Sequence, residues 1–119
     1  MSNGKIHSIH LEELVNNLKY IGEDSKKIEF IIKEGSWFKK GTGNLYSLCD
    51  LLLLKYDGSG FPLELKGCRN KRSKALDQIK HGRDCLVNVF NRNVEYGKIV
   101  YYHMDGYPVD KVYFDKRKK

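Results

Sequence analysis

Two acidic residues and a lysine are the groups of this chain that could perform chemistry together: Asp50, and Glu64 followed by Leu65 and Lys66. Mg²⁺ prefers oxygen ligands and keeps several waters, so we expect Asp50, Glu64 and the Leu65 carbonyl to hold it. A bound Mg²⁺ neutralises phosphoryl oxygens and lowers the pKa of an attacking water. The Lys66 ammonium would either orient that water or stabilise the phosphate in the transition state. The pattern indicates phosphodiester hydrolysis.

A β-hairpin must bring these residues together. Apolar runs flank residues 57–60, and an Asp-Gly pair between such runs is typical of a hairpin turn. In an antiparallel hairpin, the residue numbers of each facing pair add up to a constant, which is about 116 for a turn centred near residue 58. Asp50 is then expected to face Lys66. Glu64 becomes the diagonal neighbour of Asp50 on the opposite strand. All three polar groups then project from one side of the sheet, whereas a slip of one residue would separate Asp50 from the other two. The opposite side is expected to carry Leu51, Leu53, Leu63 and Leu65.

The alternative interpretation is that Asp50 lies at a strand edge and that residues 64–66 form an ordinary half-exposed strand, since Glu-x-Lys often occurs by chance. Asp50 directly precedes four leucines, however. A carboxylate buried there is costly unless it is paired or bound to a metal. We therefore favour the metal site.

The N-terminal part of the chain predicts a helix and a strand before the hairpin. Apolar residues recur at helical spacing over residues 11–21, behind Ser8 as an N-cap and before Gly22 as a helix end. Residues 27–33 alternate as expected for a strand.

The C-terminal part predicts a second helix and two more strands. Ser73 is a plausible N-cap for the helix, which Gly82 weakens at its far end. Residues 86–90 and 98–102 are expected to be strands around a turn. The order helix, three strands, helix, two strands predicts an α/β fold with a mixed sheet flanked by helices. The strands of Asp50 and Glu64 should lie in its middle, because an unbroken leucine run is typical of a strand covered on both faces.

The composition indicates one domain without a membrane span. The 119 residues suffice for a single domain over residues 1–115, with a basic tail at 116–119. No apolar run approaches the ~20 residues of a span, and the N-terminus does not resemble a signal peptide. We therefore expect an intracellular protein, either cytoplasmic or a viral protein expressed in the host cell. Three cysteines without a C-x-x-C pair favour free thiols.

The net charge of +7 is concentrated in the second half of the chain. Residues 61–119 contain fourteen Lys and Arg against seven Asp and Glu, whereas residues 1–60 contain eight of each. A basic cluster next to an acidic pair suits contacts with a phosphate backbone, although a solvated tail explains the last four residues equally well. The predicted nucleic-acid contacts are Lys39, Lys40, Arg69, Lys71, Arg72 and Lys74.

Asp50 and the segment Glu64-Leu65-Lys66, within this order of elements, resemble the PD-(D/E)XK nuclease superfamily. The small size, the Gly- and Ser-containing loop before Asp50 and the basic stretch after Lys66 are most similar to archaeal and viral Holliday junction resolvases and to virus-type replication-repair nucleases. The resemblance implies a restriction-endonuclease-like fold in which Asp50 and Glu64 bind the metal and Lys66 is catalytic. It also implies a catalytic role for Gln78 on the following helix, for which a plain surface role is an equally good interpretation.

The chain departs from the superfamily pattern at two places. Cys49 stands where the motif has a proline, which lowers the specificity of the match. Many members use a glutamate of the first helix, but Glu12 and Glu13 point away from the apolar stripe, so we predict neither as catalytic. The four histidines show no ligand spacing, and structural or solvent-exposed roles are favoured for His7, His10, His81 and His103.

The resemblance implies a Mg²⁺-dependent endonuclease, with Mn²⁺ as a substitute, that acts on branched DNA such as Holliday junctions. Cutting two strands symmetrically requires two active sites, so we expect a homodimer. One alternative is a restriction-type, nicking or RNA-cleaving nuclease of the same superfamily. The other is a non-catalytic nucleic-acid-binding protein.

Overall fold

The computed structural model describes residues 3–33, 49–102 and 107–114, and the side chains from residue 7 onward. The types of element follow one another in the predicted order, but the last two strands are formed by other segments than predicted, except for the overlap at residues 98–101. The elements are α1 (Asn3–Asn16), the 3-10 turns η1 (Leu18–Ile21) and η2 (Ser25–Lys27), β1 (Ile28–Lys33), β2 (Leu51–Lys55), β3 (Gly60–Lys66), η3 (Arg69–Lys71), α2 (Arg72–Asn88), β4 (Tyr96–Tyr101) and β5 (Val109–Tyr113).

The five strands form one mixed sheet in the order β1-β2-β3-β4-β5. The pair β3 and β4 is parallel and is connected through α2, whereas the other neighbouring strands are antiparallel. The strand of Glu64 is therefore central, and the strand that follows Asp50 lies beside it. The predicted mixed α/β sheet is confirmed.

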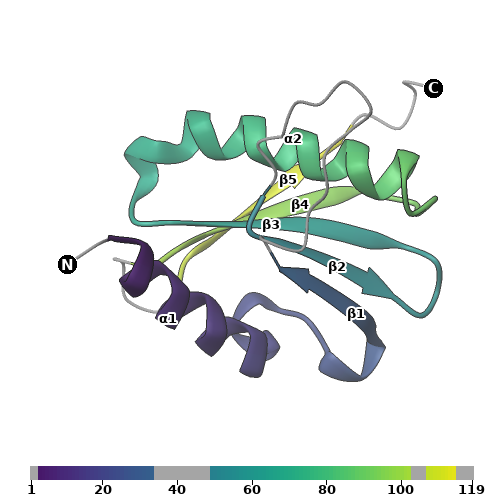
Figure 1. The fold of residues 1–119 in the computed structure, drawn as a ribbon, viewed down its shortest axis with the longest axis horizontal. Helices are drawn as coiled ribbons and strands as arrows, with labels where there is room; N and C mark the ends of the chain where they lie inside the picture. Colours follow the sequence, from purple (N-terminus) through teal and green to yellow (C-terminus); the bar gives the residue numbers. More distant parts are fainter. Residues whose placement is uncertain (1–2, 34–48, 103–106, 115–119) are drawn as a thin grey trace.

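The two helices lie on opposite faces of the sheet (Figure 1). On one face, residues of α1 and η1 pack against alternate residues of β2 and β3 in a core of Leu14, Leu18, Ile21, Leu51, Leu53, Phe61, Leu63, Leu65 and Val100. On the other face, residues of α2 cover the intervening positions of β2 and β4. The leucines of β2 are all buried because helices cover both faces of this strand, as the unbroken apolar run predicted.

The register of the β2–β3 hairpin differs from the predicted one by two residues. Leu51 faces Leu63, so the pairing continues to Asp50 opposite Glu64, not opposite Lys66. The turn is centred one residue earlier than predicted because the Asp57 carboxylate accepts hydrogen bonds from the backbone N–H and the hydroxyl of Ser59, at 2.9 and 2.6 Å. A shift of two residues preserves the faces, so the predicted separation of polar and leucine sides is correct.

Four of the predicted boundaries are wrong. Ser8 lies inside α1, which begins at Asn3, and Ser73 lies inside α2, which begins directly after η3. The predicted strand over residues 86–90 is largely the last turn of α2, because Leu86 continues the buried stripe that includes Ala75, Ile79 and Gly82. Helical packing of this stripe outweighs the β-propensity of the valines that follow. The predicted first helix over residues 11–21 also ends too late, because α1 stops at Asn16 and Gly22, in the left-handed conformation, ends only the separate 3-10 turn η1.

The last strand of the sheet was not predicted. β5 forms the edge beside β4, and Tyr113 remains exposed there. Among the described residues, neither helix combines the length and the apolar character that crossing a membrane requires. The three cysteines are free thiols, as expected.

Candidate active site

The β2–β3 hairpin places Asp50 and Glu64 side by side. Asp50 directly precedes β2, and Glu64 is near the end of β3, on the side of the molecule where α1 and α2 begin (Figure 1). Asp50 is 4% exposed and Glu64 is 1% exposed. Two carboxylates thus lie next to each other in a nearly dry part of the sheet.

Backbone hydrogen bonds fix the orientation of both carboxylates. The N–H of Asp50 donates to Glu64 Oε1 at 2.9 Å, and the N–H of Leu65 donates to Asp50 Oδ2 at 2.7 Å. Each acidic side chain is therefore held by the backbone of the opposite strand. The pair cannot separate without disrupting the hairpin.

Two basic groups reach the acidic pair from different elements. Lys66 lies two residues after Glu64 on β3, and its Nζ is 3.2 Å from Glu64 Oε2. His7 comes from α1, and its Nε2 lies 3.0 Å from Asp50 Oδ2 and 3.1 Å from the Leu65 carbonyl oxygen. The structure therefore brings together the three predicted groups and a fourth group that was not predicted.

The pKa of Glu64 shows that these basic groups do not balance the carboxylates. Burial, together with the charge of Asp50, raises the pKa of Glu64 to about 8, although Lys66 acts in the opposite direction. The hydrogen bond to Asp50 raises the pKa of His7 against the effect of burial. Burial, and the charges of Glu64 and Asp50, also raise the pKa of the Cys49 thiol well above its ordinary value, which makes Cys49 a poor nucleophile. Burial and the neighbouring carboxylate therefore favour the protonated form of Glu64 more strongly than Lys66 opposes it.

A second buried ionic cluster, at the opposite end of the hairpin, provides a comparison. Glu23 Oε2 lies 2.6 Å from Lys98 Nζ, and Glu23 Oε1 lies 3.2 Å from Lys55 Nζ. Burial alone would raise the pKa of Glu23, but the hydrogen bonds and charges of the two lysines outweigh it and lower this pKa. A carboxylate with two ammonium groups is compensated, which is what a structural cluster requires.

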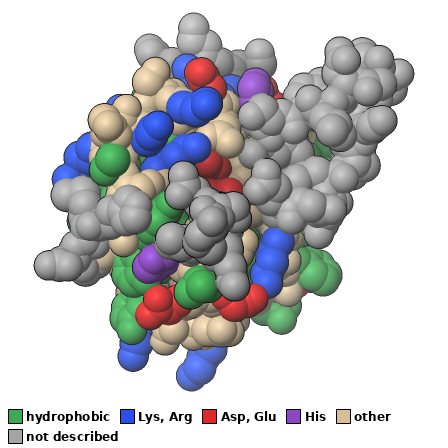
Figure 2. Space-filling view, turned by 60° about the vertical axis from the view of Figure 1, so that its left-hand side comes forward, with side chains coloured by type: hydrophobic (Ala, Val, Ile, Leu, Met, Phe, Trp, Pro, Cys, Tyr) green, Lys and Arg blue, Asp and Glu red, His purple; other side chains and the backbone are tan. Residues whose placement is uncertain are grey.

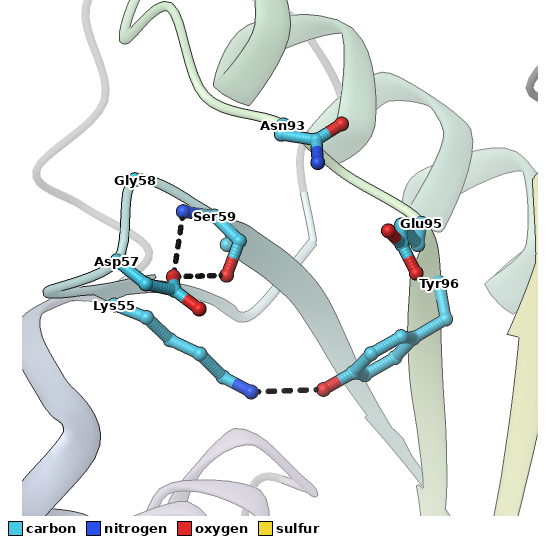
Figure 3. A pocket seen from close by; sticks show the side chains of 8 residues that line it. Lys55, Asp57, Gly58, Ser59, Asn93, Glu95 and Tyr96 are labelled. Atoms are coloured by element: carbon cyan, nitrogen blue, oxygen red, sulfur yellow. Dashed lines mark hydrogen bonds between the residues drawn. The ribbon is translucent and has the colours of Figure 1, made fainter.

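Beside this second cluster is a pocket of about 330 Å³, lined mainly by the turn residues 57–60 and by Lys55 and Tyr96 (Figure 3). Its main polar side chains are paired with each other: Lys55 Nζ donates to the Tyr96 hydroxyl at 3.1 Å, and Asp57 accepts from Ser59. We therefore assign this end of the sheet a structural role and regard the Asp50 end as the candidate active site.

The donor set of the Asp50 end suits a hard dication. Among the described residues, no three His, Cys, Asp or Glu side chains meet closely enough to enclose an ion by themselves. An ion would therefore depend on the Leu65 carbonyl and on water in addition to the carboxylates. Mg²⁺ is commonly held in this way, and a dication would favour the ionised form of Glu64.

Gln78 lies on the helix that covers this site. Gly82, one turn later, packs so closely that an added Cβ would come within 2.8 Å of Pro62 Cβ. α2 runs back along β3 (Figure 1), and Gln78 precedes Gly82 on this helix by four residues, a rise of about 6 Å. Its Oε1 is buried and has no hydrogen-bond partner among the described residues. A buried acceptor without a partner is costly, which suits a residue that binds a ligand.

The predicted nucleic-acid contacts of the described residues lie just after β3. Lys71 and Lys74 are exposed, Arg72 Nε is 3.3 Å from Asp110 Oδ2, and the Arg69 guanidinium lies 5.1 Å from the centroid of the Tyr101 ring. Figure 2 shows lysine and arginine side chains gathered on this face of the molecule, close to acidic side chains near its centre. Lys39 and Lys40 lie outside the described residues.

His7 is the site residue that the sequence interpretation missed. The signal that could have revealed it is spacing: His7, Leu11, Leu14 and Leu18 follow one another at steps of four, three and four, so His7 extends the inward-facing stripe by one turn. The helix was predicted to start too late to include it. Glu12 is paired with Lys33 and Glu13 accepts from Tyr107, so neither reaches the site, as expected.

Comparison with family models, curated proteins and solved structures gave no match. The function must therefore be argued from the site.

Proposed function

We propose that this protein is a metal-dependent nuclease that hydrolyses phosphodiester bonds in DNA, with a site of the PD-(D/E)XK type on a restriction-endonuclease-like fold. The observation that carries the proposal is the pair of buried carboxylates, Asp50 and Glu64, which lie beside the ammonium of Lys66 where burial and the second carboxylate raise the pKa of Glu64 in spite of that ammonium. A structural ion cluster would be compensated, as Glu23 is by its two lysines.

Each group has a role in this proposal. Asp50, Glu64 and the Leu65 carbonyl would hold Mg²⁺, or Mn²⁺ in its place, and the bound ion would supply charge for the phosphoryl oxygens and an acidified water. The Lys66 ammonium, 3.2 Å from Glu64, would lie beside the scissile phosphate and stabilise the negative charge that develops on it. The amide of Gln78 would orient the phosphate or the water by hydrogen bonding.

The basic residues after β3 support DNA as the substrate. Lys71 and Lys74 are exposed beside the site, where neutralised phosphates would release their counterions. We further propose branched DNA, such as a Holliday junction, as the preferred substrate and a homodimer as the active form, because two symmetric cuts require two sites. These two points rest on the resemblance described above.

The test compares a supercoiled plasmid, a linear duplex and a synthetic four-way junction, each incubated with the protein in Mg²⁺, Mn²⁺ or EDTA. Metal-dependent and junction-selective cutting is the expected result. Cutting of the linear duplex at similar rates would favour a restriction-type nuclease, and cutting of RNA alone would favour an RNA-cleaving one. DNA that is retarded in a gel but stays intact in every metal would favour the non-catalytic binding protein and refute the proposal.

A pair of aspartate variants makes this test specific. Asp50→Asn should reduce cleavage at least ~10³-fold while leaving DNA affinity within a few-fold, because it removes a metal ligand but no DNA-binding cation. Asp84→Asn is the matched control, since Asp84 is exposed on α2 and its carboxylate pairs with the neighbouring Arg83. Equal activity of the two variants would show that the ligand assignment is wrong.

A further inference from the structure

A row of aromatic rings runs beside α1 from the candidate site to the surface of the protein. It begins at His7, whose ring meets the Tyr102 ring edge to face at a centroid distance of 6.1 Å. His10 stacks on Tyr102 at 4.7 Å and meets the Tyr107 ring at 5.9 Å. The last ring is that of Tyr20, which stacks on Tyr107 at 5.8 Å with an angle of 20° between the ring planes. Each ring is within the distance at which aromatic pairs attract each other.

Tyr20 presents the end of this row to solvent. One side of its ring packs on Tyr107, and 46% of the residue is exposed. Its backbone is fixed in η1, where its N–H donates to the Asn17 carbonyl oxygen at 3.0 Å. A ring that is already held in this way loses little conformational freedom when a ligand stacks on its open side.

The backbone of Tyr107, which supports this ring, is in a strained conformation. Its φ of 56° less six, that is 50°, lies in the left-handed region that bulky residues rarely adopt. The Tyr107 hydroxyl donates to Glu13 Oε1 at 2.5 Å and lies 3.0 Å from His10 Nδ1. Both partners belong to α1, so this helix holds the Tyr107 ring against Tyr20. Strained residues that are held by their surroundings concentrate at binding sites.

The open side of Tyr20 suits an unpaired nucleobase. Every base has a π face that can stack on an aromatic ring, whereas the bases of an intact duplex are already stacked on each other. Lys19, adjacent to Tyr20 in the chain, is exposed and can contact a phosphate that flanks such a base. A protein partner would instead require a broader apolar patch, but Asn16 and Lys19 are exposed polar residues.

We infer that Tyr20 stacks on an unpaired base of the nucleic acid, and that this contact makes the protein prefer DNA with unpaired bases over an intact duplex. The inference rests on the nucleic-acid binding of the proposed function and deepens it by naming a residue that determines specificity. The row of rings links Tyr20 to His7, which contacts Asp50, so the stacked base would lie on the α1 side of the candidate active site.

The first test measures DNA binding in EDTA, so that metal-dependent cutting cannot occur. Fluorescence anisotropy of the full chain is recorded with three labelled DNAs of one sequence: an intact duplex, the same duplex with a gap in one strand, and a single strand. Tyr20→Ala should weaken binding of the gapped and single-stranded DNA about 5- to 100-fold, as expected for the loss of one stacked base, and duplex binding by less than about twofold. Tyr20→Phe keeps the ring and should stay within about threefold of wild type.

Tyr56→Ala is the matched control for these variants. Tyr56 is a tyrosine that is 69% exposed in the turn between β2 and β3, at the end of the hairpin that is remote from Asp50. Its replacement should leave the affinity for all three DNAs unchanged. Circular dichroism shows whether each variant is folded.

Photocrosslinking observes the contact directly and needs no variant. Iododeoxyuridine is placed in the unpaired stretch of the gapped DNA, and its complex with the wild-type protein is irradiated. Mass spectrometry of the peptide that becomes linked to DNA should identify Tyr20. Crosslinks that form only at other residues would overturn the inference.

The outcomes separate this inference from the proposed function. Unchanged binding of gapped DNA by Tyr20→Ala would overturn the inference and favour a protein as the partner of this surface, and an equal loss for duplex and gapped DNA would overturn the preference for unpaired bases. Metal-dependent cutting could still be observed in either case. A crosslink at Tyr20 in a protein that binds DNA but never cuts it would support the inference and refute the nuclease. A protein that binds no DNA would overturn both.

Discussion

Replacing Glu64 with glutamine should stabilise the metal-free protein at neutral pH, which is unusual for a substitution at a buried polar residue. The pKa of Glu64 is raised from an ordinary value of 4.5 to about 8 in the folded protein. The folded state therefore holds the proton more tightly than the unfolded chain, and this group favours folding less and less as the pH rises above 4.5. Above about pH 8, Glu64 is ionised in both states, and its contribution to the unfolding free energy no longer changes with pH.

The size of the effect follows from the same values. From pH 4.5 upward, the loss of unfolding free energy grows by about 1.4 kcal/mol per pH unit and reaches about 3 kcal/mol at pH 7. Glutamine cannot ionise, and its amide oxygen can still accept from the Asp50 N–H, but Lys66 loses its charged partner. We expect a net gain of about 1–3 kcal/mol at pH 7, which is a rise of about 1 M in the urea midpoint, and almost none at pH 4.5.

The assay is urea unfolding followed by circular dichroism at pH 4.5, 7 and 8.5 in EDTA. Carboxylates with lowered pKa values, such as Glu23, stabilise both proteins more as the pH rises. Their contribution cancels when the unfolding free energy of wild type is subtracted from that of the variant, so this difference reports on Glu64. Glu12→Gln, at an exposed carboxylate paired with Lys33, is the control and should change stability by no more than about 0.5 kcal/mol at each pH. A Glu64→Gln protein that is no more stable than wild type at pH 7, or equally stabilised at pH 4.5, would refute the interpretation of an uncompensated site.

Three further predictions concern the two ends of the sheet. Glu23→Gln should have the opposite effect and destabilise the protein at pH 7 by about 3 kcal/mol in the same urea assay, because it leaves two lysines without their carboxylate. Gly82→Ala should cost about 1–3 kcal/mol, measured by thermal unfolding, since the new Cβ would come within 2.5 Å of Cys49 Sγ and the helix would have to move. Metal affinity measured by calorimetry should rise up to about tenfold per pH unit between pH 6.5 and 8, because the ion must displace the proton of Glu64; affinity independent of pH would contradict the raised pKa.

The sequence was sufficient to predict which residues share a face of the hairpin. Side chains alternate between the two faces of a strand, so a register shift by two residues leaves every side chain on the same face. Asp50, Glu64 and Lys66 therefore share a face in both the predicted and the observed register. The register itself depends on the hydrogen bonds that the Asp57 side chain makes within the turn. Such local side-chain contacts cannot be read from the alternation of apolar residues, which is why the predicted partner of Asp50 was wrong.

Features set by distant parts of the chain were less predictable. Leu86 continues the helix because the sheet offers it a buried position, whereas the neighbouring valines suggested a strand. The helical spacing places His7 on the inward-facing side of α1, but it does not indicate which residue, 43 positions later in the sequence, the imidazole contacts. The raised pKa of Glu64 also appears only when the burial of the carboxylates and the positions of nearby charges are known.

The pairing of Asp50 with Glu64 across one antiparallel hairpin also bears on how loop length can vary in related chains. Insertions or deletions that add or remove one residue on each side of residues 57–60 would change the length of the protruding ribbon while the two carboxylates still meet. An unmatched change of one residue within a strand would instead direct one carboxylate toward α1 and the other toward α2. Length variation of this hairpin in descendants of the same gene should therefore concentrate at its tip.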